Sequence, residues 1–131
     1  MTTTPYQRRK AWIASLSPER KARHKAEMAA RRQLARIYRP LKRGQLLRDD
    51  VALAVVGMRA AEFVAWVEAQ WSPGWTWANY GSTDQGALWN FDHVRAIKHF
   101  NVLDPHEARA ANHWTNLAPM CSRENDRKQH R

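Results

Sequence analysis

The sequence predicts an α+β protein, in which a mostly helical N-terminal part is followed by a compact unit of two strands and a helix. Residues 17 to 71 combine helix-capping residues with apolar residues at helical spacing. From residue 74 onward, aromatic and β-branched runs are bounded by glycines and polar turns, which is typical of short strands. The net positive charge lies in the N-terminal part of the chain. Residues 1–43 carry 13 Lys or Arg and two acidic residues, whereas residues 44–131 carry 9 Lys or Arg and 10 acidic residues.

The composition excludes several classes of protein. A length of 131 residues suits one domain, and 44% hydrophobic residues with seven tryptophans can form a core. The longest apolar run, residues 51–58, is well short of the roughly 18 residues of a membrane span. We also expect no secretory signal, because no apolar stretch follows the N-terminal charges. The single cysteine, Cys121, excludes an intramolecular disulfide and a zinc site built on two or four cysteines.

The chain is expected to begin with a loose lead-in over residues 1–16 and to continue with a long helix. Ser17 is a typical N-cap residue, and Pro18 suits the first helical position. We expect this helix to end near Tyr38, because the residue before a proline disfavours helical geometry and Pro40 follows.

The excess of positive charge in this segment indicates a polyanionic partner. Only one narrow apolar stripe runs along the expected helix, so most of its surface is basic. We expect residues 1–43 to form a basic, largely helical arm that binds nucleic-acid phosphates. The side chains of the arm expected at the phosphates are Arg20, Lys21, Arg31 and Arg32. A solvated charged helix and an organelle transit peptide are alternatives, whereas a membrane partner is not expected because few large apolar side chains could insert.

Two shorter helices are expected to support the core. One covers residues 45–56 and ends at Gly57, and the other covers residues 59–70 and is broken by the Ser-Pro-Gly sequence at 72–74. The residues expected to face inward are Leu47, Val51, Ala54, Val55, Phe63, Trp66, Val67 and Trp71.

The last part of the chain is expected to form a strand, a long loop with a small helix, a second strand and a final helix. The first strand covers residues 88–94. Asp104, followed by proline and then a glutamate, is a strong start for the small helix, which ends near Asn112. The second strand covers residues 115–120, and Ser122 caps the final helix.

Four polar residues of this unit fall in an order that suits the hydrolysis of a phosphodiester: Asp92 and His93 end the first strand, Asn116 starts the second, and Asn125 lies one turn into the final helix. His93 can act as a base near neutral pH. The developing charge calls for a divalent cation, and the oxygen atoms of Asp92 and Asn125 suit Mg²⁺ better than zinc. Neighbouring residues of a strand point to opposite faces, so Asp92 and His93 require a twist or the start of a loop to meet at one place. Arg127 or Lys128 can hold a neighbouring phosphate.

Taken together, these segments resemble the HNH endonuclease family, the ββα-metal nucleases, and more closely the small HNH proteins of phages and prophages. The resemblance spans residues 57–128. The phrases that carry it are Gly74-Trp-Thr-Trp-Ala-Asn-Tyr-Gly81, Trp89-Asn-Phe-Asp-His-Val94, Asn116-Leu-Ala-Pro-Met120 and Glu124-Asn-Asp-Arg-Lys128.

The resemblance implies a role for each of these polar residues. Asp92 and Asn125 would bind a single divalent metal ion, Mg²⁺ before Mn²⁺ or another cation. His93 would be the general base that activates water, and Asn116 would fix the loop that orients this histidine. The basic residues that follow Asn125, Arg127 and Lys128 among them, would contact the DNA backbone.

The charge distribution and the resemblance together divide the chain into two functional parts. Residues 1–43 would form the DNA-binding arm, and residues 44–131 the nuclease domain, with helical support over 44–72 and the ββα-metal core over 74–131. The paired Cys-x-x-Cys zinc motifs of many relatives are absent, so we expect the tryptophans between residues 66 and 89 to fill the core instead.

Two positions depart from the usual pattern of the family. The family usually has a proline three residues after the catalytic histidine, and this chain has Ala96 at that position. Ala118 stands where many relatives carry glutamine. Neither position has a catalytic role, so these departures affect the geometry of the loop more than the chemistry.

The expected function is metal-dependent hydrolysis of phosphodiester bonds in double-stranded DNA, by nicking or cutting, in the cytoplasm of a bacterial or phage-infected cell. A phage packaging (terminase) complex is a candidate partner. A non-catalytic DNA-binding or packaging accessory protein is the main alternative, and an RNase or toxin nuclease is a third.

Overall fold

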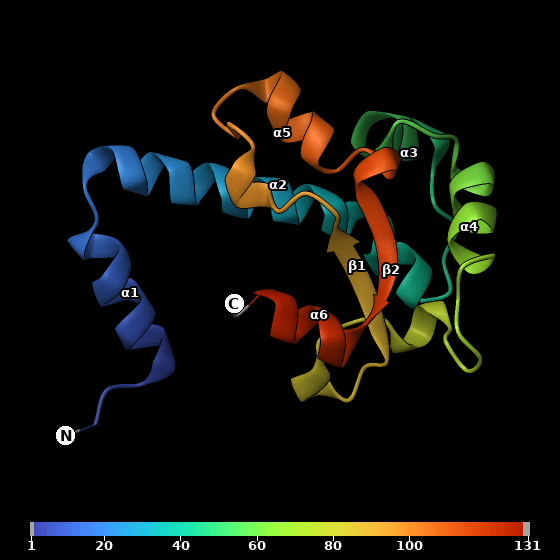
Figure 1. Ribbon diagram of the computed structural model, residues 1–131, viewed down its shortest axis with the longest axis horizontal. Helices are drawn as coiled ribbons and strands as arrows, with labels where there is room; N and C mark the ends of the chain where they lie inside the picture. The colour runs from blue at the N-terminus through green and yellow to red at the C-terminus, as the bar shows by residue number, and fades with distance from the viewer. Residues whose placement is uncertain (1, 130–131) are drawn as a thin grey trace.

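The computed structural model of the protein describes residues 2–129. Figure 1 shows how six helices and two strands of this part are arranged. They follow the order α1 (Pro5–Ser15), α2 (Pro18–Lys42), α3 (Asp49–Val56), α4 (Ala60–Glu68), β1 (Trp89–His93), α5 (Pro105–Ala111), β2 (Leu117–Cys121) and α6 (Ser122–Gln129). The predicted α+β class is confirmed, as is the order strand, loop with a small helix, strand, helix.

The two strands form one antiparallel sheet. Trp89 pairs with Cys121 at one end of the ladder, and His93 pairs with Leu117 at the other. α6 follows β2 without a connecting loop and packs against both strands (Figure 1). The second strand begins at Leu117 and not at residue 115 as expected, because residues 114–116 form a 3₁₀ turn that leads into it.

One hydrophobic core joins the sheet to the helices that precede it. Trp89 of β1, Phe63 of α4 and Ile37 of α2 are fully buried in this core. Trp89 lies edge-on to both Trp71 and Trp77, a favourable geometry for aromatic pairs. The expectation that the tryptophans between residues 66 and 89 belong to the core is therefore confirmed.

α1 is an ordered helix at the place where the sequence analysis expected a loose lead-in. The Thr4 hydroxyl accepts a hydrogen bond from the backbone N–H of Gln7, and the Gln7 side chain accepts one from the backbone N–H of Thr4. This capping box, with Pro5 at the first helical position, satisfies the free N–H groups that begin a helix. None of the residues of α1 is buried, and in Figure 1 the helix projects from the N-terminal end of α2.

α2 continues through Pro40 to Lys42, so the expected end near Tyr38 is wrong. A proline near a helix end removes one N–H group, and the second half of this helix gains burial that offsets the lost hydrogen bond. Leu34 and Ile37 are buried in the main core, and Tyr38 stacks on Tyr80 with ring centres 4.2 Å apart. The second half of α2 thus belongs to the same core as the sheet.

The two supporting helices, α3 and α4, are shorter than expected, but they lie where the sequence placed them. Gly57 ends α3 in the left-handed conformation, with φ of 76°. Ala54 was expected to face inward and is exposed, because α3 turns Ala52, Val55 and Val56 toward the core. Within residues 2–129, no helix combines the length and the apolar character needed to cross a membrane.

Candidate active site

A basic pocket lies where β1 ends, between α2 and the last turn of α6. It has a volume of about 260 Å³. Asp92 and His93 come from β1, Arg31 from α2 and Lys128 from α6. Glu27, Ala96, Ile97 and Lys98 complete its described lining. The pocket brings together residues that lie up to one hundred positions apart in the sequence.

Asp92 and His93 both line this pocket although they are neighbours in one strand. His93 is the last residue of β1, and the chain turns away after Val94, whose N–H donates to the backbone oxygen of Asn116 over 2.9 Å. His93 is thus the last paired residue of the strand, and the loop begins directly after it. The loop start that the sequence analysis required at this point is present.

The Asp92 carboxylate is buried and paired with a lysine. Lys128 donates from Nζ to both carboxylate oxygens, at 2.9 Å each. Only 8% of the Asp92 side chain is exposed, against 42% of the Lys128 side chain. A buried carboxylate needs a cation beside it, and in this structure Lys128 supplies the charge.

His93 is held by one side-chain hydrogen bond and is biased toward its neutral form. Its Nε2 lies 2.9 Å from Oδ1 of Asn112. Burial lowers the pKa of His93 below its ordinary value of 6.5, and the positive charges of Arg31 and Lys128 lower this pKa further. The hydrogen bond to Asn112 and the charge of Asp92 act in the opposite direction but do not outweigh burial. At neutral pH the ring is therefore uncharged, with one nitrogen able to accept a proton.

Asn116 fixes the backbone that follows His93. Its Oδ1 accepts the N–H of Arg95 over 2.8 Å, and its Nδ2 donates to the backbone oxygens of Arg95 and Ala111 at 3.1 and 2.8 Å. The side chain makes no hydrogen bond to His93 among those of the described residues. Asn116 thus connects the loop after β1 to the end of α5.

Asn125 is fully buried beside the strands, and its two amide atoms differ in their partners. Nδ2 donates to Oδ1 of Asn90 over 2.6 Å and to the backbone oxygen of Phe91 over 3.0 Å. Oδ1 has no hydrogen-bond partner within residues 2–129. An unpartnered buried oxygen is destabilising unless a ligand occupies it, and an amide oxygen is a ligand that Mg²⁺ accepts.

A metal site here would be sparse in protein ligands. The described residues contain no group of three or more His, Cys, Asp or Glu side chains that could hold an ion. Asp92 lines this pocket, whereas Asn125, whose Oδ1 has no hydrogen-bond partner within residues 2–129, lines a second pocket that shares Arg31 and His93 with the first. Mg²⁺ is commonly bound by one or two carboxylates, with water and phosphate oxygens as the remaining ligands. Oxygen atoms of this kind suit Mg²⁺ better than zinc, and the expected Mg²⁺ site stays a prediction.

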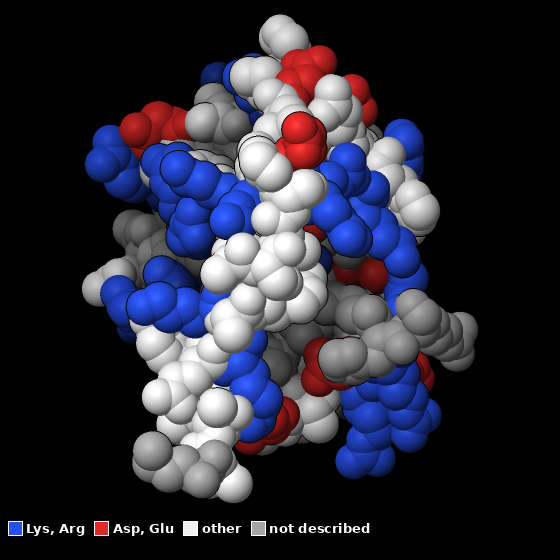
Figure 2. Space-filling model, turned by 90° about the vertical axis from the view of Figure 1, so that its left-hand side faces the viewer, with Lys and Arg blue, Asp and Glu red and all other residues white. Residues whose placement is uncertain are grey.

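The residues expected to contact DNA divide into two groups. Arg31 and Lys128 line the pocket with His93. The other four, Arg20, Lys21, Arg32 and Arg127, are exposed and lie outside the lining of the pocket. Figure 2 looks onto the end of the molecule that carries α1 and shows Lys and Arg side chains on both sides of an uncharged ridge.

Three polar residues of the site were missed by the sequence analysis. Glu27 and Lys98 line the pocket, and Asn112 contacts His93. Asn112 follows the last residue of α5, a position at which an asparagine commonly ends a helix. No sequence signal separates this ordinary helix end from a residue that touches the histidine, because the contact depends on how α5 packs.

Comparison with known proteins identifies viral relatives of this chain. No protein-family model matches it, and no solved structure matches it with significance. "Uncharacterized protein L426" of Acanthamoeba polyphaga mimivirus is 30% identical over 94 residues, which are 72% of this chain and 38% of that protein. "Uncharacterized protein L246" of the same virus is 31% identical over 58 residues, which are 44% of this chain and 24% of that protein. The chain thus spans less than half the length of these curated relatives.

Proposed function

We propose that the protein is a metal-dependent endonuclease of the HNH type that hydrolyses phosphodiester bonds in double-stranded DNA. One observation carries the proposal. Asp92 and His93 meet in a single pocket with the cations Arg31 and Lys128, and burial keeps the histidine neutral there. A neutral base, a buried carboxylate and two positive side chains are the groups that phosphodiester hydrolysis requires.

His93 would take the proton from the attacking water. The water oxygen bonds to phosphorus, its proton passes to the ring nitrogen of His93, and the bond from phosphorus to the leaving sugar oxygen breaks. Arg31 and Lys98 stand in the pocket to bind the phosphate oxygens. Asp92 and Asn125 would hold a divalent ion, which, when bound, stabilises the negative charge of the transition state.

The basic surface supports DNA as the substrate. Residues 1–43 have 13 basic and two acidic side chains, and the pocket opens beside α2, which carries many of them. Phosphate contacts of this kind bind any sequence and weaken as salt is added. The similarity to two virus proteins is in keeping with a viral or phage setting, in which a packaging (terminase) complex would be a natural partner.

The test is cleavage of supercoiled plasmid in Mg²⁺, in Mn²⁺ and in EDTA. We expect relaxed or linear product that requires the metal, and His93→Ala should lower the rate by about 10²- to 10⁴-fold while DNA binding is retained. His106→Ala, which removes an exposed histidine outside the pocket, is the matched control and should cleave like the original protein. Equal cleavage by His93→Ala would exclude His93 as the base.

A second candidate function is a non-catalytic DNA-binding accessory protein. The observation that favours it is the ion pair between Lys128 and Asp92, because it occupies the carboxylate that a metal would need. A well-folded protein that binds DNA in a salt-sensitive manner, but cleaves it under none of these conditions, would support this second function over the first.

A further inference from the structure

A buried amide connects His93 to the long helix α2. Asn112 is only 2% exposed. Its Nδ2 donates to the backbone oxygen of Ala30 in α2 over 2.8 Å, and its Oδ1 lies 2.9 Å from Nε2 of His93. The two partners of this one side chain come from segments more than sixty residues apart in the chain.

The first of these hydrogen bonds determines the direction of the second. A backbone oxygen only accepts, so the NH₂ group of Asn112 must face Ala30 and its Oδ1 must face His93. Because an amide oxygen also only accepts, Nε2 of His93 carries the proton and donates it. Nδ1 is then left as the ring nitrogen with the free electron pair, which is the atom that can accept a proton.

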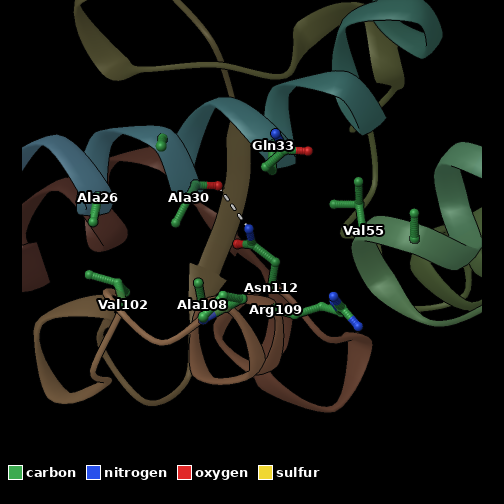
Figure 3. A pocket seen from close by; sticks show the side chains of 11 residues that line it. Ala26, Ala30, Gln33, Val55, Val102, Ala108, Arg109 and Asn112 are labelled. Carbon is green, nitrogen blue, oxygen red and sulfur yellow. Dashed lines mark hydrogen bonds between the residues drawn. The ribbon is translucent and has the colours of Figure 1, made fainter.

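Figure 3 shows Asn112 reaching from the end of α5 toward α2, with the hydrogen bond to Ala30 drawn. Beside it, small side chains such as Ala26, Ala30 and Ala108 line an open pocket of about 340 Å³. The Asn112 amide joins one helix to the other at the edge of this pocket. A directional hydrogen bond defines an orientation more strictly than contacts between small apolar groups do.

We propose that Asn112 is a positioning residue that holds the ring of His93 in one tautomer and one orientation. Its action differs from that of Asn116, which binds the backbone of Arg95 and not the ring. The two asparagines are connected, because Asn116 also binds the backbone oxygen of Ala111, next to Asn112. The consequence for catalysis rests on the proposed nuclease function, whereas the consequence for the ring of His93 does not.

The first measurement is a proton and nitrogen NMR spectrum of full-length, metal-free protein labelled with ¹⁵N-histidine. In the unaltered protein, the Nε2–H proton of His93 should be visible, because a buried, hydrogen-bonded proton exchanges slowly with water. In Asn112→Ala this signal should disappear. Asn112→Asp keeps an acceptor oxygen toward the ring, so it should restore the signal in part.

A matched control separates positioning from a general loss of stability. Asn79 also makes two hydrogen bonds with its amide, to the backbone of Thr76 and Gly74, but it lies in a different turn and does not line the pocket. Asn79→Ala should therefore lower thermal stability and leave the His93 signal unchanged.

The second measurement is the rate of plasmid nicking in Mg²⁺. We expect Asn112→Ala to lower kcat about 10- to 100-fold, the range seen when partners that orient functional histidines are removed, with KM for DNA unchanged. Asn79→Ala should keep the original kcat at a temperature at which all the variants are folded.

These measurements test the positioning role of Asn112 separately from the nuclease function. An Asn112→Ala protein that keeps the Nε2–H signal of His93, and differs only in stability, would overturn the positioning role. Loss of the signal in a protein that cleaves no DNA under any condition would support the positioning role and contradict the nuclease. If Asn112→Ala does not fold, the partial return of the signal in Asn112→Asp decides the question, and its absence there counts against the proposal.

Discussion

Two residues of the pocket, Asp92 and His93, carry most of its chemistry, and each depends on a partner from another helix. Lys128 of α6 neutralises the carboxylate, and Asn112 at the end of α5 binds the ring. Both functional groups are largely buried, so the loss of either partner leaves a polar group without compensation. Removal of either partner should therefore lower stability as well as alter binding and titration at the pocket.

The low pKa of His93 predicts how stability changes with pH. The unfolded chain binds a proton at His93 near pH 6.5, whereas the folded protein binds it only at lower pH, because burial disfavours the charged ring. The folded state thus holds fewer protons in this window. The free energy of unfolding should fall as the pH is lowered from 6.5 through the folded pKa, and it should be constant above 6.5 as far as this residue is concerned.

Urea unfolding of the metal-free protein between about pH 8 and pH 5 measures this change. His93→Gln should show a weaker dependence on pH than the original protein, and the difference between the two proteins is the contribution of His93. Parallel curves would contradict a lowered pKa.

The ion pair between Lys128 and Asp92 predicts competition with a divalent ion. The ammonium group and a metal ion need the same carboxylate, so Lys128→Met should bind Mn²⁺ more tightly. A pair worth about 1 kcal/mol corresponds to an increase in affinity of about five-fold. Isothermal calorimetry without DNA measures it, and Arg127→Met, which removes the neighbouring exposed charge, is the control. Equal affinities in both variants would contradict competition between Lys128 and the ion for Asp92.

At the scale of elements, short connections place the pocket. Asn116 connects the loop after β1 to the end of α5 through its side chain. Ser122 fixes the start of α6, because its N–H donates to the backbone oxygen of Leu88 and its hydroxyl donates to that of Gly81. Gly57 ends α3 with φ of 76°, and a Cβ atom there would lie 2.7 Å from the ring of His113. His113 in turn binds Thr115, one residue before Asn116. The end of α3 and the loop of the site are thus in contact.

This contact predicts that two glycines with the same backbone conformation differ in their tolerance of alanine. Gly44 has φ of 75°, and a Cβ atom added there would meet no atom of the described residues within 4 Å beyond its chain neighbours. Gly44→Ala should therefore cost only backbone strain, about 1–2 kcal/mol. Gly57→Ala should be more destabilising, because the overlap with His113 adds to this strain.

Chemical unfolding of the two variants measures the difference. Adding His113→Ala to Gly57→Ala should remove the overlap and bring the loss of stability close to that of Gly44→Ala. If Gly57→Ala were no less stable than Gly44→Ala, the packing of His113 against α3 would be disproved.

Most elements could be predicted from the sequence because their signals are local. Ser17 and Asp104 cap helices as expected, and the aromatic and β-branched residues around Phe91 form a strand as expected. Pro40 misled the prediction because burial of the preceding turn against the core outweighs one lost hydrogen bond, and α1 was missed although Thr4 offered a capping signal. Local patterns carry no information on which distant groups a helix will meet.

The same limit applies to the candidate site. The order of Asp92, His93, Asn116 and Asn125 is visible in the sequence. The structure brings the first three around the end of β1, whereas Asn125 lines a second pocket. The contact of Asn112 with both His93 and Ala30 depends on the packing of α5 on α2. No periodicity or spacing specifies that arrangement.

For the molecule as a whole, positive charge and burial are distributed differently along the first 43 residues. α1 has no buried residue, whereas the second half of α2 contributes Leu34 and Ile37 to the main core. The basic segment thus contains one part that the fold requires and one part that it does not. Two truncations can separate affinity for DNA from folding.

Removal of residues 2–16 should leave a folded protein that binds DNA more weakly. The deleted segment carries Arg8, Arg9 and Lys10, so the salt dependence of binding should become shallower, by up to about 3 in the slope of log K against log salt.

Removal of residues 2–43 should abolish folding, because Leu34 and Ile37 leave the core. Circular dichroism and salt titrations of DNA binding check both statements, and unchanged affinity after the shorter truncation would exclude α1 from the DNA interface.

The distribution of tryptophans gives the protein two separate fluorescent signals. Trp12 lies on α1 and is 52% exposed, so its emission should be at long wavelength and open to quenchers in solution. The other six tryptophans belong to the core or pack against it, and their emission should be at shorter wavelength until the protein unfolds. The described lining of the pocket holds no tryptophan. A ligand that reaches α1 would therefore quench the long-wavelength component alone, while a ligand confined to the pocket would change neither component, and one spectrum would distinguish the two kinds of contact.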